Sequence, residues 1–146
     1  MKKNVVKDIL EGKQSVREIL LVEGYTHYWK HKGFTDDQWT KMKAEAERVI
    51  MAAEDAGIEL ANGMGEEGTV PTVSDTEIIL NGVGEESHET LHITKAAQDF
   101  DFTKTARKAY DPVVTTLLAY ARDINPNFEP SSDGDEEDES AIKKEL

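Results

Sequence analysis

Two short segments of the chain repeat one pattern of asparagine, glycine and glutamate. Residues 62–67 read Asn-Gly-Met-Gly-Glu-Glu, and residues 81–86 read Asn-Gly-Val-Gly-Glu-Glu. If the two segments lie together, their carboxylates and backbone carbonyls form an oxygen-rich site of the type that binds Ca²⁺ or Mg²⁺. Neither segment has the alternating Asp/Asn spacing of an EF-hand, so separate solvated turns are the favoured interpretation and we expect no cofactor. The candidate metal ligands are Glu66, Glu67, Glu85 and Glu86.

The residues around the second segment offer little for catalysis. His88 and His92 fall on a predicted strand, where positions i and i+4 stand about 13 Å apart, so one metal ion cannot bind both. The chain has no cysteine, and it lacks the motifs of serine hydrolases, zinc proteases and phosphate-binding loops. A non-enzymatic protein is therefore expected. A metal-dependent hydrolase that uses the four glutamates and His88 is the weakest alternative.

Residues 100–112 contain the only locally basic cluster in the second half of the chain. Lys104, Arg107 and Lys108 could bind a partner, or they could pair with the acidic segments of the same chain. Internal pairing is favoured because residues 49–94 hold ten carboxylates and no Lys or Arg. Exposed ion pairs of this kind contribute only about 0–1 kcal/mol each.

The formal net charge of −13 is distributed unevenly. Residues 49–94 contribute −10, and residues 130–146 contribute −5 from seven Asp/Glu and two Lys. Affinity for nucleic acid comes mainly from Lys and Arg that neutralise phosphates, so direct binding of nucleic acid is not expected. The simplest role of such an acidic surface is solubility. The functional alternative is recognition of a protein partner.

Composition also bears on the cellular setting. A chain without cysteine has neither disulfides nor thiolate metal sites, so nothing indicates an oxidising compartment. No run of 18 uncharged apolar residues occurs, and the N-terminal residues lack the apolar core of a signal peptide. We therefore expect a cytoplasmic protein that does not contact a membrane.

The clearest predicted element is a helix that begins after Thr35. Thr35 and Gln38 have the spacing of a capping box, and Gly57 supplies a C-terminal stop. The apolar residues between them recur at helical spacing and predict one buried face. These residues are Trp39, Met42, Ala46, Val49, Ile50 and Ala53.

Strands and a second helix are expected further along. Residues 77–80 and 90–94 are rich in β-branched residues and are expected to pair as a hairpin, with a wide acidic loop between them. Residues 111–124 predict a last helix, with Asp111 as its cap and Pro112 in its first turn.

The two ends of the chain are less regular. Residues 5–20 predict a helix with a break at Gly12, and residues 16–30 could form either helix or strand. Residues 129–146 are too polar and acidic to offset the entropy of ordering, so we expect a disordered tail. The predicted fold is α+β, with amphipathic helices packed on a small antiparallel hairpin or sheet in one domain of residues 1–128.

Two segments together resemble a known pattern. Residues 81–90 read Asn-Gly-Val-Gly-Glu-Glu-Ser-His-Glu-Thr, and residues 102–111 read Phe-Thr-Lys-Thr-Ala-Arg-Lys-Ala-Tyr-Asp. This combination resembles small uncharacterised proteins of tailed bacteriophages over roughly residues 60–120. The pattern has Cys and Pro where this chain has Thr103 and Ala109. The resemblance implies a phage accessory protein in the cytoplasm of a host bacterium, and it implies no activity.

The leading functional hypothesis is a non-enzymatic interaction protein that binds a host or phage protein through an acidic surface. The alternative is a module for a small ligand, a nucleotide or a divalent metal, built from the two repeated loops. The sequence leaves open the identity of the partner, the oligomeric state and whether the loops converge. The candidate interaction residues are Glu66, Glu67, Glu85, Glu86, His88, Glu89, Lys104, Arg107 and Lys108.

Overall fold

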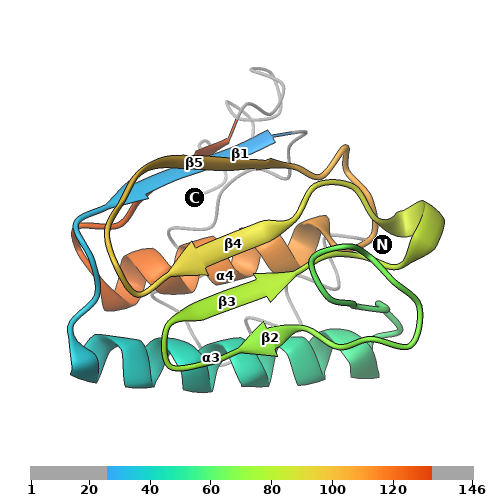
Figure 1. The fold of residues 1–146 in the computed structure, drawn as a ribbon, viewed down its shortest axis with the longest axis horizontal. Helices are drawn as coiled ribbons and strands as arrows, with labels where there is room; N and C mark the ends of the chain where they lie inside the picture. The colour runs from blue at the N-terminus through green and yellow to red at the C-terminus, as the bar shows by residue number, and fades with distance from the viewer. Residues whose placement is uncertain (1–25, 133–146) are drawn as a thin grey trace, which may run out of the picture.

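A computed structural model describes residues 26–132 of the chain. The helix predicted for residues 5–20 and the tail beyond residue 132 lie outside the described residues. The described part is an α+β fold of two α-helices and two three-stranded antiparallel sheets (Figure 1). In chain order the elements are β1 (Thr26–His31), α3 (Asp36–Asp55), β2 (Thr72–Val73), β3 (Glu77–Leu80), the 3-10 helix η1 (Gly84–Glu86), β4 (Leu91–Thr94), β5 (Gln98–Lys104), α4 (Asp111–Ile124) and β6 (Glu129–Ser132).

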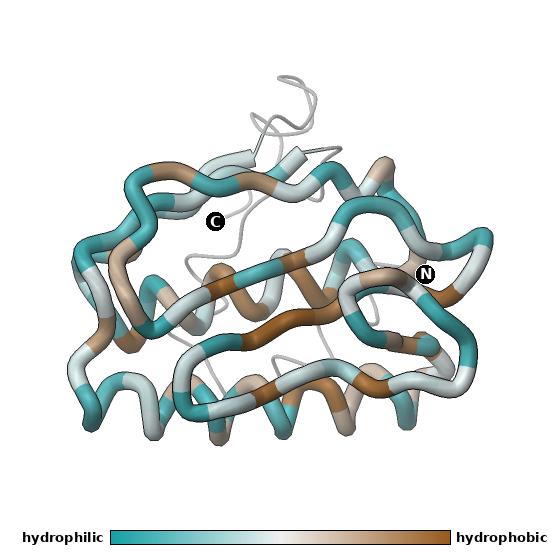
Figure 2. The backbone as a smooth tube through the Cα atoms, in the orientation of Figure 1, coloured by the Kyte–Doolittle hydropathy of each residue, from teal (hydrophilic) through white to brown (hydrophobic). Residues whose placement is uncertain are grey.

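The predicted hairpin is present and belongs to the sheet of order β2-β3-β4. Its strands pair antiparallel, with Ile78 opposite Ile93 and Leu80 opposite Leu91. These four side chains are buried, which is the alternation expected of strands with one face on a core. Figure 2 shows the apolar residues concentrated along β3, β4 and α4.

The second sheet, of order β5-β1-β6, was not predicted. Its central strand β1 shows that residues 26–30, within the segment 16–30 that the sequence left open between helix and strand, form a strand. On its inner face Trp29 Nε1 donates to Gln98 Oε1 at 3.1 Å, and His31 Nε2 contacts the same oxygen at 3.0 Å. The N–H of Gly33 donates to His31 Nδ1, and burial lowers the pKa of His31. Both observations are consistent with a neutral imidazole that carries its proton on Nε2.

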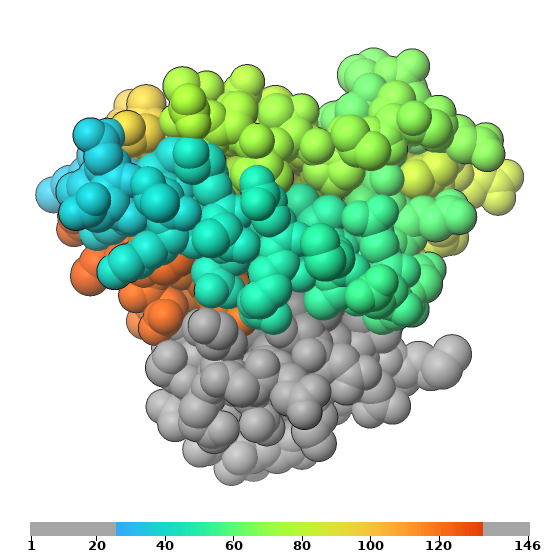
Figure 3. Space-filling model, turned by 90° about the horizontal axis from the view of Figure 1, so that it is seen from below, coloured from blue at the N-terminus to red at the C-terminus, as the bar shows by residue number. Residues whose placement is uncertain are grey.

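Helix α3 forms as its local sequence predicts. The Thr35 side chain accepts the N–H of Gln38, and the Gln38 side chain accepts the N–H of Thr35, so the capping box is complete. In Figure 3, the exposed side of α3 (teal) runs across the face of the molecule that is seen from below. A hydrogen bond from Lys95 lowers the pKa of Asp36 at its first turn. Of the predicted apolar face, Trp39, Met42, Ala46, Val49 and Ala53 are buried, and Ile50 is half-buried against the core.

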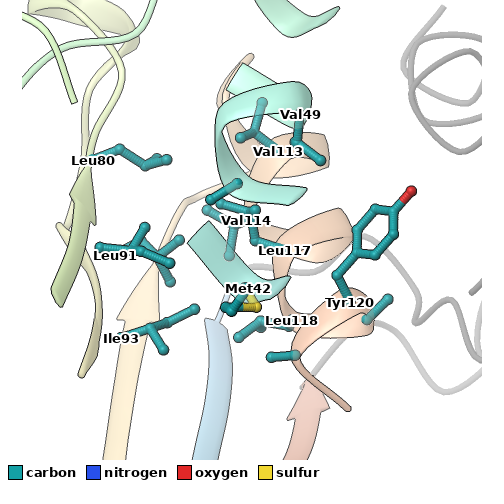
Figure 4. Close-up of a cluster of buried hydrophobic side chains, with 14 of the residues drawn as sticks. Met42, Val49, Leu80, Leu91, Ile93, Val113, Val114, Leu117, Leu118 and Tyr120 are labelled. Carbon is teal, nitrogen blue, oxygen red and sulfur yellow. The ribbon is translucent and has the colours of Figure 1, made fainter. Parts of the chain in front are cut away.

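Helix α4 has the predicted bounds and is the centre of the core. Every residue from Asp111 to Ala121 is buried, which is typical of a helix covered on all sides. Figure 4 shows side chains of both helices and of the β3-β4 hairpin pointing toward one another. The side chains labelled there are Met42, Val49, Leu80, Leu91, Ile93, Val113, Val114, Leu117, Leu118 and Tyr120.

The predicted cap of α4 and the predicted start of the tail were both wrong. Asp111 does not cap α4, because the cap position is Tyr110 and Asp111 is the first helical residue, with its carboxylate inside the protein. The polar residues 129–132 do not belong to a disordered tail, because they form β6 and pair with β1 from His27 to Lys30. Across residues 26–132, no helix is long and apolar enough to span a membrane.

The two helices are joined by a contact whose effect on pH dependence can be measured. Arg48 of α3 donates to the Tyr120 hydroxyl of α4, and its guanidinium lies 5.2 Å from the centre of the ring. Burial raises the pKa of Tyr120 from 10.0 to about 12. Tyrosines of the unfolded chain ionise near pH 10. Between about pH 10 and 12 the folded state therefore keeps a proton that the unfolded state has lost, and the free energy of unfolding falls as pH rises.

We expect the wild type to lose stability relative to Tyr120→Phe across this window, since the variant has no proton to lose there. Urea unfolding of both proteins at pH 9, 10, 11 and 12 measures the difference. Tyr110, whose pKa burial also raises, is common to both proteins and cancels. Unfolding free energies that decline in parallel would contradict the role given to Tyr120.

Candidate functional site

The two repeated loops touch each other through their backbones. The N–H of Gly84 donates to the carbonyl of Gly65 at 3.0 Å, and Ala61 and Asn81 form an isolated β-bridge. The Asn81 side chain reaches across and donates Nδ2 to the carbonyl of Gly63 at 3.1 Å. The convergence that the sequence left open is therefore real.

The asparagine of each loop organises that loop. Asn62 Oδ1 accepts the N–H groups of Met64 at 3.1 Å and Glu66 at 3.3 Å. Asn81 Oδ1 accepts those of Gly82 at 2.7 Å and His88 at 3.0 Å. A short side-chain oxygen that bonds nearby backbone N–H groups stabilises a turn. The asparagine therefore holds each loop, but Asn62 bonds positions i+2 and i+4 whereas Asn81 bonds positions i+1 and i+7, so the two loops are bonded differently.

Glycine is required where the second loop closes most tightly. A Cβ on Gly82 would stand 2.1 Å from the carbonyl oxygen of Glu86 and 3.0 Å from a ring carbon of Tyr110. Backbone cannot retreat as a flexible side chain can, so the loop must open to accept any larger residue. Gly84, two residues on, has φ +55° but meets nothing within 4 Å.

We expect Gly82→Ala to lower the free energy of unfolding by about 2–3 kcal/mol, as overpacking a closed site does. The matched control Gly84→Ala has a strained φ without a clash and is expected to cost about 1 kcal/mol. Urea unfolding of both variants gives the comparison. Equal losses would mean that the close approach of Gly82 to Glu86 does not hold the loop.

The loop carboxylates do not assemble a metal site. Glu66 Oε1 accepts the Asn62 side-chain amide at 2.9 Å, and Glu86 Oε1 accepts the N–H of Ala109 at 3.3 Å. Glu67 and Glu85 are exposed. Within residues 26–132, no group of three or more His, Asp or Glu side chains is arranged to hold a metal ion. The backbones of the loops converge, but the predicted ligands Glu66, Glu67, Glu85 and Glu86 do not.

Within residues 26–132, the Lys104 end of the predicted basic cluster lies against the second loop mainly through backbone hydrogen bonds. Glu89 and Lys104 are joined in both directions, by Glu89 N–H to the Lys104 carbonyl at 3.0 Å and by Lys104 N–H to Glu89 Oε1 at 2.9 Å. The Tyr110 hydroxyl donates to the Glu89 carbonyl at 2.7 Å. Among the described residues, neither Lys104 nor Lys108 forms an ion pair with a loop glutamate. The contact between the acidic and basic segments runs mainly through backbone groups.

One turn of this cluster has an unusual backbone. Ala106 and Arg107 are the two non-glycine residues with positive φ in the described part of the chain, at 51° and 58°. The turn 105–108 closes through a hydrogen bond from Lys108 N–H to the Thr105 carbonyl at 2.9 Å. Left-handed conformations cost a non-glycine residue about 1–2 kcal/mol, so the surrounding contacts hold this turn against strain.

The contacts between the two repeated loops place exposed carboxylates at one end of the fold. Two loops and the C-terminal end of α3 meet there, on the right in Figure 1. We call this surface the acidic end; in the described part of the chain, none of its carboxylates belongs to an ion pair. Helix α3 also has no basic residue in its last turn to offset the negative end of its dipole. The acidic end consists of Glu54, Asp55, Glu59, Glu66, Glu67, Glu85 and Glu86.

The two candidate histidines lie apart from any shared site. His88 is exposed. Its backbone N–H donates to Asn81 Oδ1, and this hydrogen bond helps to hold the second loop. His92 Nε2 contacts Glu77 Oε1 at 2.9 Å across the β3-β4 ladder, at the surface. Within residues 26–132, neither histidine belongs to a group of three or more His, Asp or Glu side chains that could hold a metal ion.

Sequence reasoning missed a buried polar chain. His27 Nε2 lies 2.6 Å from Asp111 Oδ1, and His27 Nδ1 lies 2.6 Å from Ser132 Oγ. Thr105 Oγ1 donates to the same Asp111 oxygen at 2.5 Å. The order Ser-His-Asp is that of a nucleophilic triad, but His27 and Asp111 are 0% exposed. The polar chain instead connects β1, β6 and α4 inside the protein.

A second missed feature is apolar and exposed. Phe100 is 61% exposed and Phe102 is 43% exposed, although both lie on a strand of the sheet. The alternation in Gln98–Lys104 could have revealed them, because every second residue of a strand points to the same face. The sequence analysis did not use this alternation, because Asp99 and Asp101 make the segment polar on average.

Comparison with protein-family models, with curated proteins and with solved structures returned no match. The function therefore has to be inferred from the residues of this chain.

Proposed function

We propose that this chain is a non-enzymatic interaction protein whose acidic end binds a basic surface of a protein partner. The observation that supports the proposal is the gathering of seven exposed carboxylates, none of them in an ion pair within residues 26–132. Carboxylates gathered in this way repel one another and destabilise the compact state. A partner that brings cations relieves that repulsion and is drawn to the surface by long-range attraction.

The loops that carry these carboxylates are internally bonded. Asn62 and Asn81 fix each loop, and the Gly84–Gly65 hydrogen bond joins the two. A preorganised surface loses less entropy on binding than a flexible one does. The acidic end is thus suited to recognition. It differs from a merely solubilising acidic stretch because hydrogen bonds hold its loops in one conformation.

The alternative of a nucleotide or small-ligand module receives less support from the same loops. Phosphate binding by a glycine-rich loop requires free backbone N–H groups. Those of Gly65, Glu66, Gly82, Gly84 and His88 already donate to groups within the loops. A ligand would have to displace these hydrogen bonds.

The resemblance to phage proteins supplies the setting of the proposal. The proposed partner is accordingly a host or phage protein in the cytoplasm of an infected bacterium. A basic surface that normally grips nucleic acid has the charge that the acidic end complements. The acidic end would then compete with nucleic acid for that surface.

A charge-matched pair of variants tests the proposal. The first variant converts Glu59, Glu67 and Glu85 of the acidic end to Gln, and the control converts three exposed acids elsewhere, Glu47→Gln, Asp99→Asn and Asp123→Asn. A photo-crosslinker at position 64, where Met64 is 80% exposed beside Glu66, captures the partner from bacterial lysate for identification and purification.

The acidic-end variant is expected to bind the purified partner at least about tenfold more weakly at low salt, mainly through slower association. The control is expected to bind as the wild type does, although it carries the same net charge as the acidic-end variant. Surface plasmon resonance at two salt concentrations gives both rates. Equal affinities for the two variants would show that only the total charge matters and would refute a defined acidic site.

A further inference from the structure

The Asn-Gly dipeptides of the two repeated loops have similar sequence neighbours but different surroundings in the structure. Asn-Gly is the dipeptide in which asparagine deamidates most readily, because glycine has no side chain to hinder attack by its own nitrogen. Asn62 and Gly63 are half-buried, so both are open to water. Asn81 is 2% exposed, and Gly82 is also buried. One chain therefore holds the same reactive dipeptide in a wet and in a dry environment.

The backbone N–H of the glycine differs between the two dipeptides. In the part of the chain that the structure describes, the N–H of Gly63 donates to no acceptor. The N–H of Gly82 instead donates to Asn81 Oδ1 at 2.7 Å. An amide nitrogen becomes a nucleophile only after hydroxide has removed its proton, and a buried, hydrogen-bonded N–H is protected from hydroxide. The nitrogen of Gly63 is thus the more reactive of the two.

The side chain of Asn62 is held as an electrophile. Its Oδ1 accepts the N–H groups of Met64 at 3.1 Å and Glu66 at 3.3 Å. Backbone donors directed at an oxygen that becomes negative stabilise that charge, as the oxyanion holes of acyl-transfer enzymes do. The Asn62 amide nitrogen donates to Glu66 Oε1 at 2.9 Å, and Glu66 is exposed. Water can therefore reach the nitrogen that would leave.

We propose that Asn62 is a site of spontaneous deamidation. After loss of its proton, the Gly63 nitrogen attacks Asn62 Cγ and forms the new C–N bond of a succinimide ring. The bond from Cγ to Nδ2 breaks, and Nδ2 leaves as ammonia with a proton supplied by water. A water molecule then opens the ring at either carbonyl, which gives aspartate or isoaspartate at position 62. The net reaction consumes one water and releases one ammonia.

Asn81 is protected from the same reaction by its hydrogen bonds. Its Nδ2 donates to the carbonyls of Gly63 at 3.1 Å and His88 at 2.9 Å, and its Oδ1 accepts the N–H of His88 at 3.0 Å. Ring closure at Asn81 would break contacts to both loops inside the protein. The loss of one buried hydrogen bond is enough to slow a reaction by about tenfold.

Deamidation at Asn62 changes the acidic end. Either product lacks the amide N–H that holds Glu66 Oε1, and it puts a new negative charge beside that carboxylate. Isoaspartate also lengthens the backbone next to the β-bridge between Ala61 and Asn81. The first loop therefore gains charge and loses a restraint as the molecule ages. The reaction is measured on the chain alone, so it is independent of the binding proposed for the acidic end.

Peptide mapping of the full chain by mass spectrometry tests the proposal. Cleavage after glutamate at mildly acidic pH yields peptides 60–66 and 78–85, each with one Asn-Gly dipeptide. In the folded chain, we expect Asn62 to convert at least about tenfold faster than Asn81. In concentrated urea the structure no longer protects either dipeptide, so the two rates are expected to be nearly equal.

The products and two controls identify the mechanism. Aspartate and isoaspartate, which chromatography separates, are both expected at position 62, and their rate of formation is expected to rise with pH. The variant Asn62→Gln is expected to leave peptide 60–66 unchanged, because glutamine would have to form a larger ring. Asn127, which is exposed but is followed by Phe128, controls for exposure alone and is also expected to stay unchanged.

Three results would overturn the proposal. The first is an equal rate at Asn62 and Asn81 in the folded chain, since the structure would then select neither. The second is an unchanged Asn62 in the folded chain over the time in which the chain in urea converts completely. The third is aspartate without isoaspartate at position 62, because direct hydrolysis of the amide, without attack by Gly63, gives aspartate alone.

Discussion

Replacement of Asp111 by Ala is expected to lower the free energy of unfolding by about 2–5 kcal/mol, because it leaves two buried hydrogen-bonding groups unsatisfied at about 1–3 kcal/mol each. The Asp111 carboxylate accepts from Thr105 and lies 2.6 Å from His27, and both His27 and Asp111 are 0% exposed. Without the carboxylate, His27 and Thr105 each lose a hydrogen-bond partner inside the protein, where both side chains are buried. A loss of this size is a large fraction of the 5–15 kcal/mol that a domain typically has.

Urea unfolding followed by circular dichroism measures this effect. Asp123→Ala, an exposed acid on the same helix, is the matched control and is expected to change stability by less than about 0.5 kcal/mol. Asp111→Asn keeps one acceptor oxygen and should fall between the wild type and Asp111→Ala. If Asp111→Ala were no more damaging than Asp123→Ala, the polar chain would be incidental to the joining of β1 and α4.

The parts of the fold that could be predicted are those that short stretches of sequence encode. The capping box at Thr35 and Gln38 and the apolar stripe from Trp39 to Ala53 fixed α3, because their signals lie within one helix. The β3-β4 hairpin likewise pairs residues separated by only one loop. Such elements need no knowledge of the rest of the chain.

The β5-β1-β6 sheet could not be predicted because its partners are remote. His27 pairs with Thr103 on one side and with Ser132 on the other, and the Ser132 contact spans 105 positions. The sequence of β6, Glu-Pro-Ser-Ser, has no strand propensity of its own. Pairing along β1 overrides that composition, and the first four residues of the predicted tail become part of the sheet.

Asp111 shows how one residue in the sequence can be compatible with two different structural roles, of which the fold uses only one. An Asp before a Pro at the start of an apolar run predicts a helix cap. The structure uses the same carboxylate for His27, which is 84 positions earlier, and Tyr110 occupies the cap position instead. Local sequence cannot distinguish these uses, because the competing partner is visible only after the chain has folded.

The repeated Asn-Gly pattern drew attention to two loops whose convergence the sequence left open, and the structure shows that the loop backbones do converge. The sequence offered metal ligation as the alternative to separate solvated turns. In the structure the asparagines hold the loop backbones, and Glu66 and Glu86 accept hydrogen bonds from separate partners. Direction of side chains within a loop depends on backbone conformations that residue types alone do not determine.

Two truncations that differ by four residues locate the C-terminal boundary of the domain. A chain that ends at Ser132 keeps β6, and it is expected to unfold with the same cooperativity as the full chain. A chain that ends at Phe128 loses the pairing of β6 with β1 and the partner of His27 Nδ1. We expect it to be less stable by about 2–4 kcal/mol, since a buried imidazole nitrogen is left unsatisfied and an edge of β1 is exposed.

The substitution Ser132→Ala separates the two contributions, because it removes the hydroxyl and leaves the strand in place. Its expected cost is about 1–2 kcal/mol, the penalty for one unsatisfied buried group. The remainder of the loss on truncation then measures the strand pairing itself. Thermal unfolding of all four proteins in one buffer provides the comparison. If the two truncated chains melted at the same temperature, the domain would end at Phe128, and the pairing of β6 with β1 would contribute nothing to its stability.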